Sequence, residues 1–202
     1  KNDGTTAVCN SAPAAITVST AKNGQVTPGD FTCEGFFRFD GTGWKANMGS
    51  YALLRRMSLL TRLYYSSGSK IVWSLRLGSL STEKHELSIQ ALTAGGQEVS
   101  ASDTGDYFND GKWHHVAVTH DVAAGKLCVY YDYALAFEIA DVGALKDNSV
   151  EWGYLGMGYG STFGLNDFYG WFDEFRYSRG VLTTEEMLHL DGEPTGMMML
   201  FR

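Results

Sequence analysis

The sequence has few cysteines and few prolines, and the shortage of cysteine limits the kinds of site that it can encode. Its 202 residues include 3 Cys and 3 Pro. The cysteines, at positions 9, 33 and 128, are too few and too scattered for a zinc site or a disulfide framework. At most one disulfide bond can form, and the sequence leaves open whether Cys9 pairs with Cys33. Cys33 and Cys128 also suit small apolar positions in strands.

The sequence also lacks a concentration of positive charge and a long uninterrupted apolar run. Its formal net charge is -7 and its pI is near 5.1, which argues against nucleic acid or an anionic membrane as a partner. The apolar stretch at 51–63 is interrupted by Arg55, Arg56 and Arg62, so it cannot cross a bilayer. We therefore expect neither nucleic-acid binding nor membrane insertion.

Aromatic residues and glycine are abundant, and they occur in alternating patterns. Aromatic residues make up 13% of the chain and Gly numbers 24, which suits strands joined by turns. The stretches FTCEGFFRF at 31–39 and IVWSLRL at 71–77 alternate apolar with polar residues, as half-buried strands do. The residues that we expect to face the core are Phe31, Cys33, Phe37, Phe39, Trp73, Leu75, Leu77, Leu87 and Ile89.

These patterns predict an all-β protein, either a two-sheet sandwich or a barrel. The length favours one domain over residues 1–202, with a core at about 16–190 and an apolar tail at 191–202. Only TTEEMLHL at 183–190 has a helical pattern, because Glu186 follows Thr183 at the spacing of a capping box. We therefore expect one short helix near the C-terminus.

The stretch DGKWHHVAVTHD at 110–121 invites a reading as a metal site or an active site, but alternation argues against both. On a strand, the adjacent His114 and His115 project to opposite faces. His114 and His120 share a face but lie roughly 20 Å apart, which is too far for a common ion. The sequence places no nucleophile beside either ring. We expect a strand of the sandwich, with His115 hydrogen-bonded beside Trp113.

Three segments in order resemble a known family. DFTCEGFFRFD at 30–40, DGKWHHVAVTHD with the following GKLCVYYD at 125–132, and GWFDEFRYSRGVLTTEEM at 170–187 are similar to segments of the laminin G-like, concanavalin A-like jelly rolls of the lectin/glucanase superfamily. The resemblance implies a two-sheet antiparallel jelly-roll sandwich with one short C-terminal helix. The chain departs from the family at Tyr133, where the hairpin turn usually has glycine.

The fold alone does not decide between binding and catalysis, so the choice depends on the acidic residues. A glycosidase needs two carboxyl groups that face one sugar bond. The best acidic pair here, Asp173 and Glu174, is adjacent and would project to opposite faces of a strand. We therefore do not expect an enzyme, and a polysaccharide-cleaving activity is the least favoured function.

Asp173 is the strongest candidate for a metal ligand. On a regular strand it shares a face with the aromatic residues Trp171, Phe175 and Tyr177, where a carboxylate is costly unless a cation or hydrogen-bond donors compensate. The family resemblance implies one structural calcium ion there, with Asp30 as a second ligand. The alternative is an arginine partner or backbone amide donors.

The polar sides of the central strands form the best candidate for ligand binding. The predicted outer face contains Arg62, Ser74, Arg76, Ser88 and Gln90, together with Glu86. Its donors and acceptors suit sugar hydroxyls, and its arginines suit a carboxylated or sulfated glycan. The alternative is an ordinary solvated face. Aromatic residues that could lie under a sugar ring are Trp44, Tyr64, Trp152 and Tyr159.

These observations and the resemblance together predict a noncatalytic carbohydrate-recognition or adhesion module of an extracellular, secreted or cell-surface protein. Its partner would be a glycan or a cell-surface or matrix molecule. The alternative is a structural subunit of a surface layer, filament or larger assembly that binds no glycan. The tail GEPTGMMMLFR bears on this choice, because its apolar end must either pack on the sandwich or dock on a neighbouring molecule, which would give self-assembly.

Overall fold

The computed structural model describes residues 7–8, 16–19, 29–39, 57–66, 68–78, 85–105, 107–108, 110–146, 151–155, 171–189 and 199–201. Side chains are described at 29–39, 59–60, 72–78, 85–105, 107–108, 110–146 and 171–189. Among these residues, no helix is long and apolar enough to cross a membrane.

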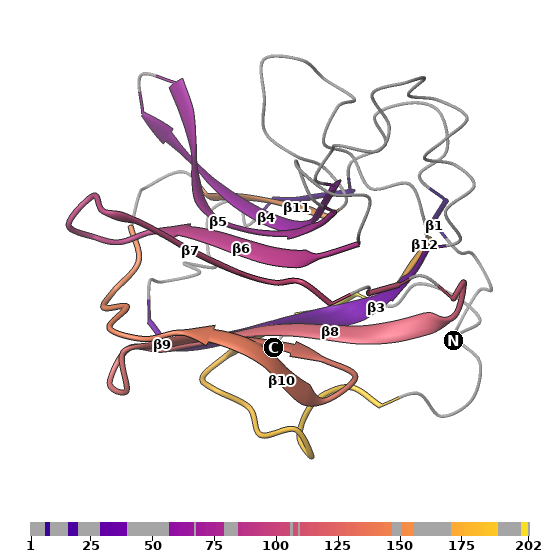
Figure 1. Ribbon diagram of the computed structural model, residues 1–202. Helices are drawn as coiled ribbons and strands as arrows, with labels where there is room; N and C mark the ends of the chain where they lie inside the picture. Colours follow the sequence, from indigo (N-terminus) through magenta and orange to yellow (C-terminus); the bar gives the residue numbers. More distant parts are fainter. Residues whose placement is uncertain are drawn as a thin grey trace.

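Two sheets lie face to face and form the two layers of a sandwich (Figure 1). Sheet A has the strand order β1 (Ala7–Val8), β12 (Trp171–Arg179), β3 (Phe31–Arg38), β8 (Trp113–Asp121), β9 (Lys126–Tyr131) and β10 (Ala134–Ile139), and β13 (Met199–Phe201) also pairs with β12. Sheet B has the order β2 (Ile16–Ser19), β11 (Glu151–Leu155), β4 (Met57–Ser66), β5 (Gly68–Leu77), β6 (Leu87–Leu92) and β7 (Glu98–Asp103). Except for the parallel pair of β12 and β13, neighbouring strands are antiparallel, which confirms the two-sheet antiparallel jelly roll.

The core lies between the sheets and follows the alternation in the sequence. On β3, Phe31, Cys33 and Phe37 belong to the core cluster, and so do Leu75 and Leu87 on the facing sheet. The other predicted core residues, namely Phe39, Trp73, Leu77 and Ile89, also belong to it. The inward set was therefore predicted correctly, because alternate residues of a strand point to one face.

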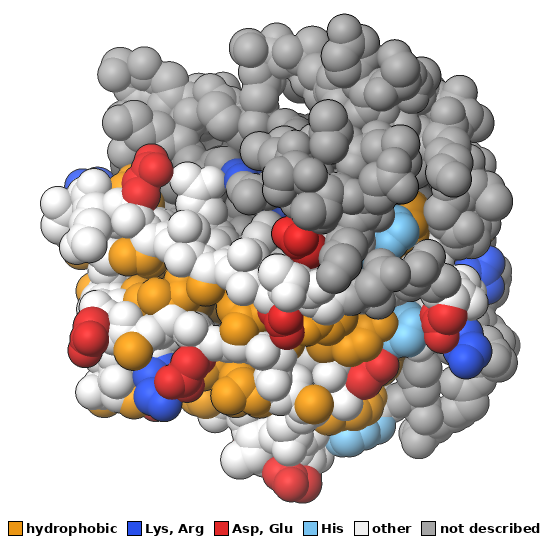
Figure 2. Space-filling view, in the orientation of Figure 1, with side chains coloured by type: hydrophobic (Ala, Val, Ile, Leu, Met, Phe, Trp, Pro, Cys, Tyr) orange, Lys and Arg blue, Asp and Glu red, His pale blue; other side chains and the backbone are white. Residues whose placement is uncertain are grey.

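One side of the sandwich is closed by its edge strands. β7 of sheet B and β10 of sheet A contact each other although they belong to different sheets. Val99 of β7 and Phe137 and Ile139 of β10 pack partly buried against the core. In the space-filling view, apolar side chains form a band on the side of the molecule shown in Figure 2.

The predicted helix at 183–190 is wrong, because residues 183–189 form a turn and then an extended segment. The capping-box contact does form: Thr183 N donates to Glu186 Oε2 at 2.9 Å. Glu186 N donates to the Thr183 carbonyl at 3.0 Å, which closes one turn. The turn does not continue into a helix, because the Glu186 carbonyl accepts from Arg176 Nη2 at 2.6 Å and Leu188 N donates to Glu34 at 2.8 Å. We call residues 181–189 the strap.

A β-bulge in β12 changes the face on which Asp173 lies. The pairing of β12 with β3 shifts between Asp173 and Arg176, and Glu174 has a positive φ of 44°. Phe175 and Tyr177 consequently pack toward the core. Asp173 is paired with Phe36, whose ring packs against His115 rather than in the core cluster. The expectation that Asp173 shares a face with Phe175 and Tyr177 is therefore wrong.

The hairpin between β9 and β10 uses a turn that normally favours glycine. Asp132 and Tyr133 have φ values of 46° and 66°, as a two-residue type I′ turn requires. The Tyr133 ring stacks on His115 with centroids 4.6 Å apart, and its hydroxyl donates to the Leu188 carbonyl at 2.9 Å. These contacts, one with β8 and one with the strap, offset the backbone cost of a residue with a Cβ in the left-handed region.

The C-terminal strand lies on the sandwich itself. Met199, Leu200 and Phe201 pair in parallel with Phe175, Arg176 and Tyr177 of β12. Of the two alternatives for the apolar tail, the backbone of these residues follows the first, packing on the sandwich. Self-assembly through the tail and the extent of one domain over 1–202 stay predictions.

Candidate functional site

The face of sheet B that points away from the core carries two rows of polar residues across β5, β6 and β7. The antiparallel register aligns them as Cα partners: Arg76, Ser88 and Ser102 in the first row, and Ser74, Gln90 and Ser100 in the second. Directly opposed residues project to the same face of a sheet, so the two rows form one polar patch.

A pocket of about 310 Å³ opens on this patch. Its lining residues are Arg76, Ser88, Ile89, Gln90, Ser100, Ala101 and Ser102. The volume lies at the small end of the range of small-molecule sites, about 300 to 1,000 Å³. The described lining carries hydroxyl groups, a carboxamide and a guanidinium but no carboxylate, imidazole or thiol. Such a set binds polar groups by hydrogen bonds, and it contains no general acid or base that works near neutral pH.

Ser88 is the polar residue of the lining that most needs a partner. It is 7% exposed, and its Oγ has no hydrogen-bond partner among the described residues. A buried hydroxyl without a partner costs about 1 to 3 kcal/mol. Because Ser88 also lines the pocket, a bound ligand can supply that partner.

Arg76 lies opposite Ser88 on β5, Gln90 lies two residues along β6, and the side chains of both form hydrogen bonds with neighbouring residues. Arg76 is partly buried, and its Nε donates to the Oγ of the fully buried Ser74 at 3.3 Å. Gln90 Nε2 donates to Glu98 Oε2 at 3.3 Å, which leaves the Gln90 carbonyl oxygen as an acceptor. The pocket therefore combines a fixed cation with neutral donors and acceptors.

The structure brings together four of the residues predicted for this face, namely Ser74, Arg76, Ser88 and Gln90. The backbone of Arg62 lies in β4 opposite Trp73, and its side chain is outside the described part of the chain. The side chains of Trp44, Tyr64, Trp152 and Tyr159 are also outside it.

Sequence reasoning missed Ser100 and Ser102, which complete the pocket from β7. Their stretch, EVSASD at 98–103, alternates in burial as a strand does, and it follows a glycine-containing turn after β6. Because this edge strand has only Val99 and Ala101 as apolar residues, its alternation is a weak signal. A hairpin alignment of 87–92 with 98–103 would have found both serines.

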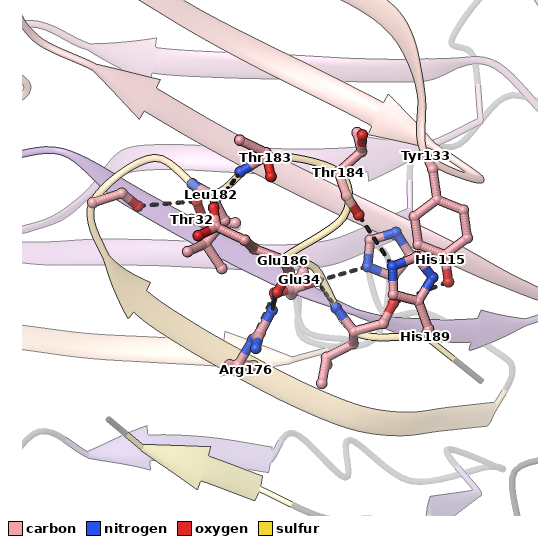
Figure 3. A network of polar contacts seen from close by, with 12 residues as sticks. Thr32, Glu34, His115, Tyr133, Arg176, Leu182, Thr183, Thr184, Glu186 and His189 are labelled. Atoms are coloured by element: carbon pink, nitrogen blue, oxygen red, sulfur yellow. Dashed lines mark hydrogen bonds and ion pairs between the residues drawn. The ribbon is translucent and has the colours of Figure 1, made fainter. Parts of the chain in front are cut away.

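The outer face of sheet A contains a second polar cluster, but this one is closed by the strap (Figure 3). The Glu34 carboxylate, which is completely buried, accepts from His115 Nε2 at 2.8 Å and from Leu188 N at 2.8 Å on one oxygen. Its other oxygen accepts from Arg176 Nε at 2.7 Å and is ion-paired with Arg176 Nη2. We call Glu34, His115 and Arg176 the Glu34 cluster.

The contacts of Glu34 favour the charged form of its carboxylate. Burial alone raises the pKa, but the hydrogen bonds from His115, Leu188 N and Arg176 outweigh it and hold the pKa below its ordinary value. Four donors saturate the two carboxylate oxygens. The cluster therefore fastens the strap to β3, β8 and β12, and His115 has Glu34 as its partner rather than a group beside Trp113.

His114 is also bound by the chain itself. Its Nε2 lies 2.8 Å from Asp110 Oδ1 and its Nδ1 lies 2.8 Å from Asp132 Oδ2. Burial lowers the pKa of His114, but the two carboxylates raise it above its ordinary value. In turn, hydrogen bonds from His114 and from the backbone amide of Lys112 lower the pKa of Asp110 to about 2. His120 contacts the carbonyl oxygens of Gly29 and Gly143 at 3.2 and 3.1 Å. The three histidines of β8 thus form contacts within the protein that stabilise the fold.

The predicted calcium ligands are not brought together. Asp30 precedes Phe31, which pairs with Arg179, whereas Asp173 pairs with Phe36, so the two aspartates lie roughly 20 Å apart along β3. Asp30 Oδ1 accepts from Val122 N at 2.8 Å, and Asp173 Oδ1 accepts from Glu174 N at 2.9 Å. The structure therefore does not bring Asp30 and Asp173 close enough to bind one ion together.

A calcium site elsewhere stays a prediction. The described residues contain no group of three or more His, Cys, Asp or Glu side chains placed to hold a metal. Calcium binding by Asp173 with ligands from other residues would be tested by calorimetry of the wild type and Asp173→Asn. Cys33 and Cys128 are buried, as expected of small strand residues, and Cys9 lies outside the described residues.

Comparison with known proteins supports this fold. A family model described as the concanavalin A-like lectin/glucanases superfamily matches residues 13–187. No curated protein matches the chain. Solved structures with similar folds include the native heptameric SAP-like pentraxin from Limulus polyphemus, with a TM-score of 0.52 and 13% sequence identity. That alignment covers 77% of this chain and 66% of the pentraxin chain.

Two further solved structures have similar folds. The Ruminococcus gnavus IT-sialidase CBM40 bound to alpha2,3 sialyllactose has a TM-score of 0.56 at 14% identity, with 78% of this chain and 80% of that chain covered. Mouse laminin alpha1 chain domains LG4-5 have a TM-score of 0.53 at 12% identity, with 85% and 40% covered. This chain thus spans less than two thirds of the pentraxin and laminin chains. At these identities the similarity establishes the fold.

Proposed function

This chain belongs to the concanavalin A-like lectin/glucanases superfamily, and we propose that it is a noncatalytic carbohydrate-recognition module that binds a saccharide in the pocket on β5, β6 and β7. The observation that carries the proposal is the buried Ser88 hydroxyl, which lines the pocket and has no partner among the described residues. Sugar hydroxyls both donate and accept hydrogen bonds, so they match serine hydroxyls and the Gln90 carboxamide.

The guanidinium of Arg76 favours a saccharide that carries an acidic group. A guanidinium offers several coplanar donors and pairs well with carboxylate or sulfate groups. Its link to Ser74 restricts its orientation before any ligand arrives, which lowers the entropic cost of binding. We therefore expect acidic saccharides to bind more tightly than neutral ones.

The setting that we propose is an extracellular or cell-surface protein in which this module recognises a glycan or a matrix partner. The similar fold of a bacterial CBM40 that was solved with sialyllactose supports a saccharide ligand. The pocket lining supports the absence of catalysis, because its described side chains offer no acid and base pair for cleavage of a sugar bond.

A saccharide array with acidic and neutral members tests the proposal. We expect saturable binding of an acidic saccharide by the wild type. Ser88→Ala should weaken it by roughly tenfold, which corresponds to one hydrogen bond of about 1.4 kcal/mol. Arg76→Gln should remove the preference for acidic over neutral saccharides. Ser178→Ala, on β12 in the other sheet, is the matched control and should bind as the wild type does.

Two results would contradict the proposal. Equal affinities of Ser88→Ala and the wild type would show that the saccharide binds elsewhere. An array without any signal, together with a molar mass that rises with protein concentration in light scattering, would favour the alternative of a structural subunit.

A further inference from the structure

A row of three large side chains crosses sheet A at the end of β3 and takes no part in the Glu34 cluster. Arg38 is the Cα partner of Trp171 on β12 and of Trp113 on β8. Directly opposed residues share a face, so the arginine stands between two indole side chains on the outer face of the sheet. All three side chains are partly exposed.

The two indoles hold the guanidinium. Arg38 Cζ lies 4.2 Å from the ring centroid of Trp171 and 5.5 Å from that of Trp113. Both distances are within the roughly 6 Å range of a cation–π interaction. Contact on both sides restricts the guanidinium, so less side-chain entropy is lost when its edge forms hydrogen bonds.

The donors of this guanidinium are not used by the rest of the described chain. The Arg38 side chain forms no hydrogen bond or ion pair with any described residue, and ring contacts are its only described interactions. Nearby carboxylates are engaged otherwise: Glu34 binds Arg176, and Asp110 binds His114 and Lys112. Asp173, one row along, is 2% exposed and accepts from its neighbouring backbone amide.

From this juxtaposition, we propose that Arg38, Trp113 and Trp171 form a second ligand site, specific for a carboxylate group. A carboxylate is planar and pairs with a guanidinium edge through two parallel hydrogen bonds. It can therefore lie in the plane of the guanidinium, between the rings of Trp113 and Trp171. A sulfate can also offer two oxygens to that edge, but its other two oxygens project out of the plane, toward the indole rings. The site lies on sheet A, whereas the pocket with Arg76 lies on sheet B, so the two sites are independent.

The test is a titration of ¹⁵N-labelled protein that follows the Nε–H resonance of Arg38. The probes are glucuronate, glucose as the matched neutral sugar, and inorganic sulfate, all at constant ionic strength. We expect a saturable shift with glucuronate, at least about tenfold weaker binding of sulfate, and no shift with glucose.

Variants separate this site from the pocket. Arg38→Lys keeps the charge but loses the planar fork, so the glucuronate-induced shifts at the indole N–H groups of Trp113 and Trp171 should weaken by at least about tenfold. Arg76→Lys and Ser88→Ala should leave the Arg38 titration unchanged within about twofold. If Arg38→Lys does not fold, the wild-type Arg38 resonance still decides the question.

Three outcomes would overturn the proposal. These are no saturable shift at Arg38 with glucuronate, an equal response to glucose or sulfate, and loss of the Arg38 response in Arg76→Lys. None of these outcomes would contradict saccharide binding in the pocket on sheet B, because that binding is tested with variants of Ser88 and Arg76.

Discussion

The Glu34 cluster and the pocket share a sequence pattern but differ in their hydrogen bonding. Both consist of polar residues that alternate with core residues on central strands. On sheet A the chain supplies four donors to one buried carboxylate and covers it with the strap. On sheet B the Ser88 hydroxyl is buried but lacks a partner within the described chain, beside a pocket. A polar residue on an outer face thus indicates binding only when the chain leaves its hydrogen bonds unmade.

The largest expected effect on stability comes from a change in the Glu34 cluster. Glu34→Gln replaces an acceptor by an amide that must face donors from His115 and Arg176, so the unfolding free energy should fall by about 3 to 5 kcal/mol. Urea unfolding followed by tryptophan fluorescence measures it. Glu185→Gln, at an exposed position of the strap, is the control and should change stability by less than about 0.5 kcal/mol. A loss below about 1 kcal/mol for Glu34→Gln would show that the cluster does not fasten the strap.

A smaller effect should follow when one contact of the strap is removed. Tyr133→Phe keeps the ring that stacks on His115 but loses the hydrogen bond to the Leu188 carbonyl. We expect a loss of about 1 kcal/mol. Hydrogen exchange should speed up in the strap while the amides of β6 and β7 keep their rates. Uniform acceleration over both sheets would mean that the strap and the sandwich open together.

In the pocket on sheet B, removal of a polar group should not lower the free energy of unfolding. Ser88→Ala removes a buried hydroxyl that has no partner in the described chain, so the unfolding free energy should stay the same or rise by up to about 1 kcal/mol. The same variant should lose saccharide affinity. A destabilised Ser88→Ala protein would indicate that the hydroxyl serves the fold, and the contrast between the two faces would disappear.

The pH dependence of stability gives the smallest effect, and it concerns His114. Its folded pKa is raised by Asp132 and Asp110, above an unfolded value of about 6.5. Its contribution is therefore fully present below pH 6.5 and is lost as the pH rises through the folded pKa. Urea midpoints should fall over that window in the wild type and in the control His189→Gln, and less in His114→Gln. Identical slopes in all three proteins would exclude His114 as the source.

The alternation of the sequence was sufficient to predict the core and most of the pocket. Trp73, Leu75 and Leu77 pack inward, and the polar residues between them, Ser74 and Arg76, follow from the same period of two. Such local rules hold where the strand is regular and both of its faces differ in polarity.

The parts that could not be predicted depend on contacts between distant residues. The helix at 183–190 fails because Leu188 N binds Glu34, which is 154 positions away. The face of Asp173 was wrong because a bulge at Glu174 interrupts the alternation of β12. The unmet hydrogen bond of Ser88 depends on what neighbouring strands offer, which no single stretch of sequence contains.

The most direct test of the contrast between the two faces is a map of backbone amide shifts when the best acidic saccharide from the array is added. We expect saturable shifts at residues 76, 88, 90, 100 and 102, together with unchanged resonances at Glu34, His115 and Leu188. Shifts confined to the Glu34 cluster and the strap, or no shifts on β5, β6 and β7, would contradict this expectation.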